Sequence, residues 1–339
     1  MADSARFLEP EVEVHCDACG AAAAAPICTA ADLAAQLELA GKFHKVRLRR
    51  RSRAALEERA LFTHDYATEL LACEKCGLLY RSPRPSPSAV LGAYAVERYA
   101  RERLPQMVFS QRALFLPKAR ALARRLHPLR RASGRDEGPP RVLEVGSFVG
   151  GFLWAAREVG IDAVGLDPSA QLSRLCTTLG LRVLQTTLEE RAATGSRELY
   201  DAVAIWNTFD QLPRPREVLA AVRRVIWPGG LLVLRFPHGA CFQRLVARRW
   251  SGRRALAWNN LLGFPYLHGY GLPSLDRLIE PFGFTRIGVR GDVLGRQADS
   301  GYARWARLEE RAVKAAQRAR FRADLAHAPW LDVVLRDAR

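Results

Sequence analysis

The chain lacks any long uninterrupted apolar segment. Its 339 residues contain no run of 18 or more apolar side chains, which is about the length needed to predict a membrane-spanning helix. Residues 1–16 alternate charged and apolar side chains and have no apolar core of the kind found in secretion signals. We therefore expect a cytoplasmic protein without a transmembrane segment.

Lysine is scarce. Only five lysines occur, so nearly all of the formal net charge of +17 comes from arginine balanced against 35 acidic residues. Alanine is abundant too, and a coding sequence rich in G and C favours both Arg and Ala. The charge excess therefore reflects composition more than a nucleic-acid partner. The densest basic run, residues 44–51, could meet a phosphate, but we expect it to be a solvated face.

Cysteine is too sparse for a disulfide scaffold, because the chain has seven in total. Four of them form two C-x-x-C-G knuckles, Cys16 with Cys19 and Cys73 with Cys76. Four thiolates suit tetrahedral zinc and leave no open coordination position, so we expect a structural metal. The alternative is two clusters of reduced thiols without a metal.

Changes in composition divide the chain into three segments. The long spacing between the knuckles is explained by a helical-looking insert at residues 30–71. Apolar residues at helical spacing predict a lead-in helix at 107–126, and Gly and Pro predict a linker at 128–140. The segments are a four-cysteine module (1–95), the lead-in helix with its linker (96–140) and a larger domain (141–339).

Short β-branched runs alternate with helical stretches after residue 140. This alternation predicts an α/β fold with a parallel, doubly wound sheet and right-handed crossovers. Insertions are expected at 240–270 and 295–328, and the second would let the last two strands pair antiparallel at the sheet edge. Strands are predicted at 141–145, 162–166, 182–184, 201–206, 231–236, 284–289 and 331–335.

A glycine turn follows the first of these strands. Gly146 permits a sharp turn, and Gly150 lets the next helix start close to the strand and to a ligand. Asp167 ends the second strand, where its carboxylate can accept hydrogen bonds from ribose hydroxyls. Phe148 breaks the G-x-G-x-x-G pattern of dinucleotide sites, and Glu144 suits a cationic ligand better than a pyrophosphate.

On these residues the segment 141–236 resembles the class I methyltransferase domain, whose cofactor is S-adenosylmethionine. Glu144, Gly146 and Gly150 match its strand-one motif, in which Phe148 replaces the central glycine. The resemblance implies a Rossmann-like methyltransferase sheet of seven strands with the last one antiparallel. It assigns cofactor contacts to Glu144, Gly146, Phe148, Gly150, Asp167 (ribose), Leu188 and Glu189 (adenine) and Asn207.

Residues 76–85 are similar to the stretch after the second knuckle in zinc-containing methyltransferases, a group that includes sugar C-methyltransferases. Those relatives carry a Glu-His pair after the fourth motif, where this chain has Asp210 and Gln211. The resemblance also places a histidine facing the acceptor at His268. We therefore expect His268 and Asp210 to be the catalytic candidates, with His238 as a weaker one.

The favoured function is methyl transfer from S-adenosylmethionine to a small-molecule acceptor such as a sugar, a lipid or a secondary metabolite. The charge and the cysteines suggest an RNA methyltransferase as an alternative, but the site reads Asn207-Thr208-Phe209-Asp210 and lacks the N-P-P-aromatic motif. Phe148 and Gln211 suggest a second alternative, a non-catalytic cofactor-binding or scaffold protein. The sequence leaves open the acceptor, the methylated atom and the oligomeric state.

Overall fold

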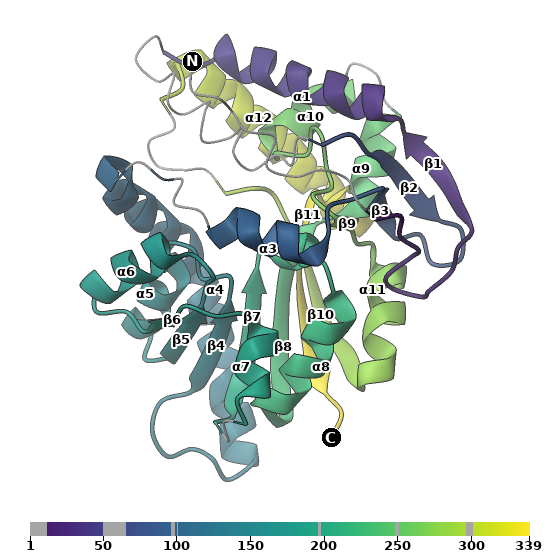
Figure 1. The fold of residues 1–339 in the computed structure, drawn as a ribbon. Helices are drawn as coiled ribbons and strands as arrows, with labels where there is room; N and C mark the ends of the chain where they lie inside the picture. Colours follow the sequence, from purple (N-terminus) through teal and green to yellow (C-terminus); the bar gives the residue numbers. More distant parts are fainter. Residues whose placement is uncertain are drawn as a thin grey trace.

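Two β-sheets organise the chain, a mixed sheet of seven strands and an antiparallel sheet of four (Figure 1). The coordinates are a computed structural model. They describe residues 12–49, 66–95, 99, 101–195, 198–247, 251–295 and 301–339.

The large sheet has the strand order β10-β11-β8-β7-β4-β5-β6. The five strands β8, β7, β4, β5 and β6 run parallel to one another. β11 runs antiparallel to both of its neighbours, β8 and β10. This topology confirms the expected Rossmann-like methyltransferase sheet. The strands are β4 (Arg141–Val145), β5 (Asp162–Leu166), β6 (Val183–Leu184), β7 (Tyr200–Trp206), β8 (Ile226–Pro237), β10 (Phe284–Asp292) and β11 (Trp330–Asp337).

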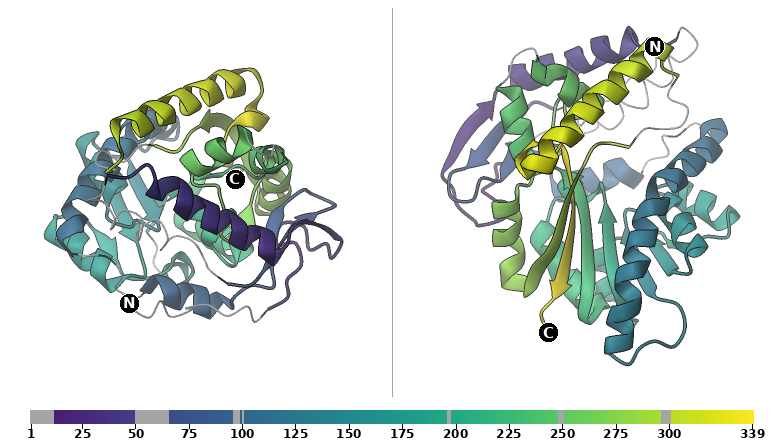
Figure 2. Two further views of the ribbon diagram at one scale, coloured as in Figure 1. Left: turned by 90° about the horizontal axis from the view of Figure 1, so that it is seen from above. Right: turned by 180° about the vertical axis from the view of Figure 1, so that it is seen from behind.

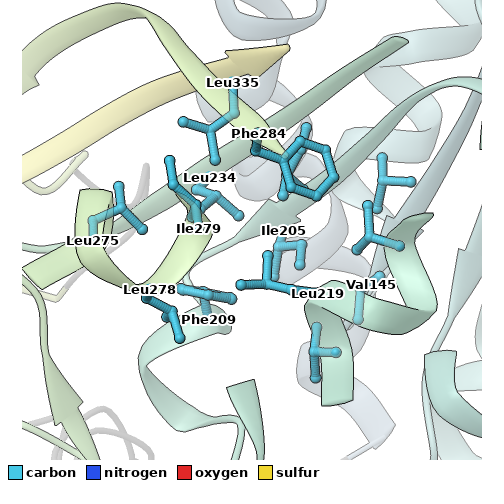
Figure 3. Packing of buried hydrophobic residues seen from close by; sticks show 14 of the residues in the cluster. Val145, Ile205, Phe209, Leu219, Leu234, Leu275, Leu278, Ile279, Phe284 and Leu335 are labelled. Atoms are coloured by element: carbon cyan, nitrogen blue, oxygen red, sulfur yellow. The ribbon is translucent and has the colours of Figure 1, made fainter. Parts of the chain in front are cut away.

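Both faces of this sheet are covered by helices, so alternate residues of each central strand enter different cores. In β7, Ala202 and Ala204 face the core shared with α4 (Leu104–Ala132) and α5 (Gly151–Glu158). Val203 and Ile205 face the opposite core, where Figure 3 shows Ile205 near side chains from α8 and α11. The remaining helices here are α6 (Ala170–Thr178), α7 (Leu188–Ala193), α8 (Pro215–Val225) and α11 (Leu272–Ile279).

The small sheet joins the N-terminal cysteine segment to the predicted 240–270 insertion. Its order is β1-β2-β3-β9, and β9 (His268–Gly269) pairs with β3 (Leu79–Ser82). Leu70 and Leu79 share a buried cluster with Phe242 and Phe264 from the insertion. The two segments therefore form one lobe above the large sheet. Its other elements are β1 (Ala24–Cys28), α1 (Ala30–Lys45), β2 (Glu69–Cys73), α9 (Gly239–Val246) and α10 (Ser251–Trp258).

Two further helices complete this end of the molecule. α3 (Pro87–Ala95) follows β3, and Figure 1 shows it across the upper end of the large sheet. α12 (Arg304–Ala323) packs on α10, and both views of Figure 2 show the yellow-green α12 beside the green helices of the insertion. Among the described residues, none of the helices has the length and apolarity needed to cross a membrane.

The lead-in helix is longer than predicted. α4 continues through Pro128 to Ala132, so the linker begins five residues later than residue 128. Arg130 holds this last turn in place, because its guanidinium donates to the carbonyls of Glu137 and Gly138, each at 2.7 Å. Asp201 lies 3.2 Å from the Nε atom of Arg130 and neutralises its charge. The polar sequence indicated a linker, whereas these contacts stabilise a helix.

Two other predictions need correction. The insert expected to be helical at 30–71 contains α1, but residues 69–71 belong to strand β2, and residues 50–65 lie outside the described part of the chain. The turn Pro228–Gly230, expected before a strand at 231, lies inside β8 at an irregularity of its pairing with β7. Backbone pairing with neighbouring strands overrides the turn signal there.

Candidate active site and four-cysteine cluster

The glycine turn lies at the carboxyl end of β4, where ligands bind in open α/β sheets. Gly146 has φ +72°, and a Cβ atom at this position would lie 2.6 Å from the Oγ1 atom of Thr208. Gly150 has φ +74°, and its Cβ would lie 2.7 Å from a methyl of Leu181. Both glycines are therefore required by backbone conformation and by close packing.

Phe148 occupies a conformation that normally favours glycine. Its φ is +50°, in the left-handed region, which costs a residue with a Cβ about 1–2 kcal/mol. Its backbone N–H donates to Oδ2 of Asp167 at 2.8 Å, and its ring meets the ring of Tyr99 edge to face at 5.3 Å. These contacts hold the turn in the shape that a glycine would give it.

Asp167 connects the glycine turn to the next strand. Its Oδ1 accepts from the backbone N–H of Ser169 at 2.9 Å, while its Oδ2 accepts from Phe148. Burial raises the pKa of this carboxyl to about 6, although the two backbone hydrogen bonds lower it. Each carboxylate oxygen has two lone pairs, so the group can still accept hydrogen bonds from a ligand.

Two more predicted cofactor residues carry buried oxygens that lack partners among the described residues. They are Oε2 of Glu144 and Oδ1 of Asn207. Burial, and then the charge of Asp167, raise the pKa of Glu144 well above its ordinary range. Asn207 follows β7 with φ +56°. Because buried polar atoms in proteins are almost always hydrogen-bonded, such oxygens indicate places where a ligand can donate.

The predicted adenine residues lie at the start of α7. Thr187 caps this helix, and its hydroxyl accepts from the backbone N–H of Glu190 at 3.2 Å. The Leu188 side chain is buried in the core beneath α8, and Glu189 is partly buried, which raises its pKa. The position of α7 after β6 brings Leu188 and Glu189 to the same end of the sheet as Asp167.

Asp210 lies in a short 3₁₀ helix, Phe209–Gln211, that follows β7. It is 1% exposed, and neither carboxylate oxygen has a partner among the described residues. Burial raises the pKa of Asp210 well above its ordinary range. The Tyr270 hydroxyl is likewise buried without a partner there, and its ring packs on Phe209 at 4.9 Å. These groups form a second polar cluster beside the cofactor residues.

Gln211, which stands where relatives have a histidine, is held by hydrogen bonds on both sides. Its Nε2 donates to the backbone carbonyl of Asn207 at 2.7 Å. Its Oε1 accepts from the Tyr94 hydroxyl of α3 at 2.5 Å. This side chain therefore ties α3 to the loop that follows β7.

His268 is completely buried on β9, next to the cysteine module. Its Nε2 lies 2.8 Å from Oδ2 of Asp17 and 2.8 Å from Nη1 of Arg84. Burial lowers the pKa of this imidazole, so the ring is neutral at pH 7. Sequence reasoning identified His268 but missed Asp17 and Arg84, because the first was hidden inside a cysteine knuckle and the second in a proline-rich stretch.

His238, the weaker candidate, has a structural environment. Its Nδ1–H donates to the carbonyl of Ala328 at 3.0 Å, and burial lowers its pKa to about 4. The ring therefore stays neutral at physiological pH and fastens the start of α9 to the segment before β11.

Some side chains of the basic run 44–51 form contacts within the protein. His44 is buried, and its Nδ1 lies 2.7 Å from the hydroxyl of Tyr302. Arg47 forms two hydrogen bonds with Glu309 of α12, at 2.6 and 3.0 Å. Positions 50 and 51 lie outside the described residues. The two contacts attach the end of α1 and the residue Arg47 after it to α12 and to Tyr302 just before α12.

The four predicted metal-binding cysteines come together. All four Sγ atoms lie within 4.8 Å of one another. The distances between Cys16 and Cys76 and between Cys19 and Cys73 are both 3.5 Å. Thiolates arranged tetrahedrally at about 2.3 Å from zinc lie roughly 3.8 Å apart, so the cluster has the size that this ion requires.

The two knuckles share one backbone design. The N–H of Gly20 donates to the carbonyl of Cys16 at 2.7 Å, and the N–H of Gly77 donates to the carbonyl of Cys73 at 2.8 Å. Both glycines have positive φ, +72° and +73°. Each turn therefore bends its two thiols toward the same centre.

The fold and the glycine turn define a doubly wound α/β protein, and comparison with known proteins narrows this class. The family model for a methyltransferase domain matches residues 114–287. This match covers half of the chain, so the protein belongs to this methyltransferase family.

The individual proteins that this chain resembles match it over a short segment or at low sequence identity. The ubiquinone biosynthesis O-methyltransferase of Aliivibrio fischeri is 31% identical over 96 residues, which cover 26% of this chain and 41% of the relative. The chain thus matches about two fifths of that enzyme. Two solved structures each have a TM-score of 0.41: the plantazolicin methyltransferase BpumL with SAH (10% identity, 70% of this chain, 86% of that one) and a SAM-dependent methyltransferase from Archaeoglobus fulgidus (17%, 62%, 92%).

Proposed function

We propose that the protein transfers the methyl group of S-adenosylmethionine to a small-molecule acceptor. The observation that carries this proposal is the glycine turn from Gly146 to Gly150, fastened to Asp167 through the N–H of Phe148, in a chain of the methyltransferase family.

Each residue around the turn would contact a different part of the cofactor. The Asp167 carboxylate would accept from the ribose hydroxyls, and the buried, unpaired oxygen of Glu144 would favour the cationic amino acid and sulfonium end. Leu188 and Glu189 would lie against the adenine, and Asn207 would accept from the methionine side. The glycine backbone lets the ligand approach closely.

S-adenosylmethionine supplies an activated methyl group on a sulfonium. The protein's own contribution is to align the acceptor for an in-line displacement and to exclude water, and alignment can lower a barrier by about 7–11 kcal/mol. The upper lobe serves this purpose, since α3 and β9 both contact the loop after β7. A base is needed only where the acceptor must lose a proton.

We assign that base to Asp210. Burial without a charged partner raises the pKa of Asp210 above the ordinary carboxyl range, which makes its carboxylate a stronger base. The amide of Gln211 cannot take a proton, and it is already engaged by Tyr94 and Asn207. His268 is the second polar group that we place on the acceptor side, as an acid–base or orienting residue. Sugars, lipids and secondary metabolites fit this proposal, including the substrates of sugar C-methyltransferases.

We also propose that Cys16, Cys19, Cys73 and Cys76 bind one structural zinc ion. The size of the cluster and the matched glycine turns support this. Cys73→Ser should lose the metal, measured by elemental analysis, and should lower the melting temperature of the upper lobe. Cys241→Ser, at a buried cysteine outside the cluster, is the control and should keep the metal. Purified wild-type protein with no zinc would contradict the assignment.

The methyl-transfer proposal is tested by incubating the purified protein with labelled S-adenosylmethionine and an extract of its own host. Mass spectrometry should find a small molecule that carries the label and has gained about 14 daltons, the mass of one added CH₂. Failure to bind S-adenosylmethionine in calorimetry would refute the proposal and would favour the scaffold alternative.

A further inference from the structure

A trio of polar side chains, two of them buried, connects the first cysteine knuckle to the acceptor side. Asp17 lies inside the knuckle, Arg84 follows β3 and His268 lies on β9. Two atoms of the Arg84 guanidinium donate to the two oxygens of Asp17, at 2.9 and 3.2 Å. The imidazole Nε2 of His268 lies 2.8 Å from the same carboxylate. Arg84 is 5% exposed and His268 is 0% exposed, whereas the Asp17 side chain is 21% exposed, so Asp17 lies at the edge of this buried pair.

The trio is attached directly to the loop that carries Asp210. Arg84 donates to the carbonyl of Pro213 at 3.2 Å. The backbone N–H of Leu267, next to His268, donates to the carbonyl of Asp210 at 3.2 Å. A displacement of Asp17 would therefore move both the His268 ring and the loop that carries Asp210.

The two nitrogens of the His268 ring have different surroundings. Nε2 lies 2.8 Å from Oδ2 of Asp17 and 2.8 Å from Nη1 of Arg84. Because the carboxylate is the strongest hydrogen-bond acceptor in the trio, we assign the ring proton to Nε2, from which it is donated to Asp17. Arg84 has the Asp17 oxygens and the Pro213 carbonyl as acceptors. Nδ1 is buried and has no partner among the described residues. It then carries a lone pair that can accept one hydrogen bond.

We propose that Asp17 is a positioning residue that fixes the tautomer and the orientation of His268, so that Nδ1 accepts a hydrogen bond from a hydroxyl or amine of the methyl acceptor. The role as acceptor contact rests on the proposed methyl transfer, whereas the tautomer does not. The four-cysteine module would thereby shape the active site as well as stabilise its own fold. A carboxylate fixes the second nitrogen of functional histidines in the same way in many proteins.

The first experiment reads the tautomer. Protein labelled with ¹⁵N-histidine contains seven histidines, and His268 is assigned by the loss of its signals in His268→Gln. The wild-type spectrum should show His268 protonated on Nε2. In Asp17→Asn the side-chain amide can donate to Nε2, so the signals should move toward the Nδ1-protonated form. Asp276→Asn, which removes the charge from an exposed pair with Arg286, is the control and should leave them unchanged.

The second experiment separates positioning from general structure. In Asp17→Asn the affinity for S-adenosylhomocysteine should stay within about twofold of wild type, while label transfer to the host extract should fall about tenfold or more. A wild-type ring protonated on Nδ1 would overturn the proposal, and this result needs no variant to fold. Unchanged label transfer in a variant with the altered tautomer would also overturn the role of His268. Wild-type protein that fails to bind S-adenosylhomocysteine would instead refute the methyl-transfer function.

Discussion

The site that we propose has a cofactor half and an acceptor half, and the two are built in different ways. The proposed cofactor half comes from neighbouring turns of one sheet, and Glu144, Gly146 and Asp167 lie within a single strand–helix–strand unit. The acceptor half combines Asp210 after β7, His268 on β9 and Asp17 in the cysteine knuckle, and the last two are 251 positions apart in sequence. A glycine turn of this kind can therefore serve many enzymes, whereas the acceptor half depends on how this particular chain closes over the sheet.

The polar groups of the two halves also differ in whether they already have hydrogen-bond partners. In the cofactor half, Asp167 is already held by two backbone N–H groups, so the site is preorganised before a ligand arrives. In the acceptor half, both oxygens of Asp210 and the hydroxyl of Tyr270 have no partner among the described residues. Unpaired buried groups cost stability, about 1–3 kcal/mol each, and such groups are expected where a ligand completes the bonding.

Asp167→Ala should have the largest effect and should act on the cofactor half alone. It removes a charged acceptor that holds Phe148 and Ser169, and hydrogen bonds to a charged group are worth about 1.5–3 kcal/mol each. Calorimetry should show S-adenosylhomocysteine binding weakened by at least about 100-fold. Asp162→Ala, at the exposed opposite end of β5, is the matched control and should change the affinity by less than about twofold. Equal affinity of Asp167→Ala and wild type would show that the cofactor half lies elsewhere.

Asp210→Asn should act on the acceptor half alone. The amide keeps the size of the side chain but cannot take a proton, and positioned acid–base groups contribute about 100-fold or more to a rate. Label transfer to the host extract should fall by about 100-fold, while S-adenosylhomocysteine binds as in wild type. The melting temperature should not fall, because the variant removes a carboxyl whose pKa shows that burial disfavours its charge. A loss of cofactor affinity in this variant would break the division into two halves.

A change of pH should have a smaller effect than these two substitutions, about tenfold in the affinity for the cofactor. Burial raises the pKa of Asp167 from its ordinary 3.8 to about 6, so the carboxyl gains a proton as the pH falls below 6 and loses capacity as an acceptor. S-adenosylhomocysteine should therefore bind about tenfold more weakly at pH 5 than at pH 7. Asp167→Asn should flatten the profile, and an undiminished slope in that variant would assign the titration to another group.

The same shift has a consequence for folding. A carboxyl whose pKa is higher in the folded chain than in the unfolded chain favours folding in its protonated form. The contribution of Asp167 to the free energy of unfolding should therefore fall as the pH rises from 3.8 to about 6 and remain constant above that. Denaturant titrations of wild type and Asp167→Asn across this range measure the difference.

The sheet and the cysteine cluster could be predicted from the sequence because their signals are local. Strand–turn–helix units appear as alternating runs, and a C-x-x-C-G knuckle bends its thiols inward by its own backbone. The sequence-based assignments of the glycine turn and Asp167 rest on the same kind of signal. Phe148 shows the limit, because its left-handed φ is maintained by Asp167 and Tyr99 from outside the turn.

The features that sequence reasoning missed all depend on distant contacts. Pro128 and the polar residues after it indicate a linker. The last turn of α4 is nevertheless helical, because Arg130 donates a hydrogen bond to the carbonyl of Gly138 and pairs with Asp201. The pairing of β9 with β3 joins segments that are nearly 190 residues apart, and a two-residue strand gives no pattern of its own. Asp17 and Arg84 become part of the site only through this pairing.

Soaking a crystal of the protein with S-adenosylhomocysteine would show whether the turn at 146–150 binds the cofactor. We expect electron density for the adenosyl group over this turn, with the ribose hydroxyls within hydrogen-bond distance of the Asp167 carboxylate. Density for that compound at another place, or a turn that accepts only a pyrophosphate nucleotide, would contradict this expectation.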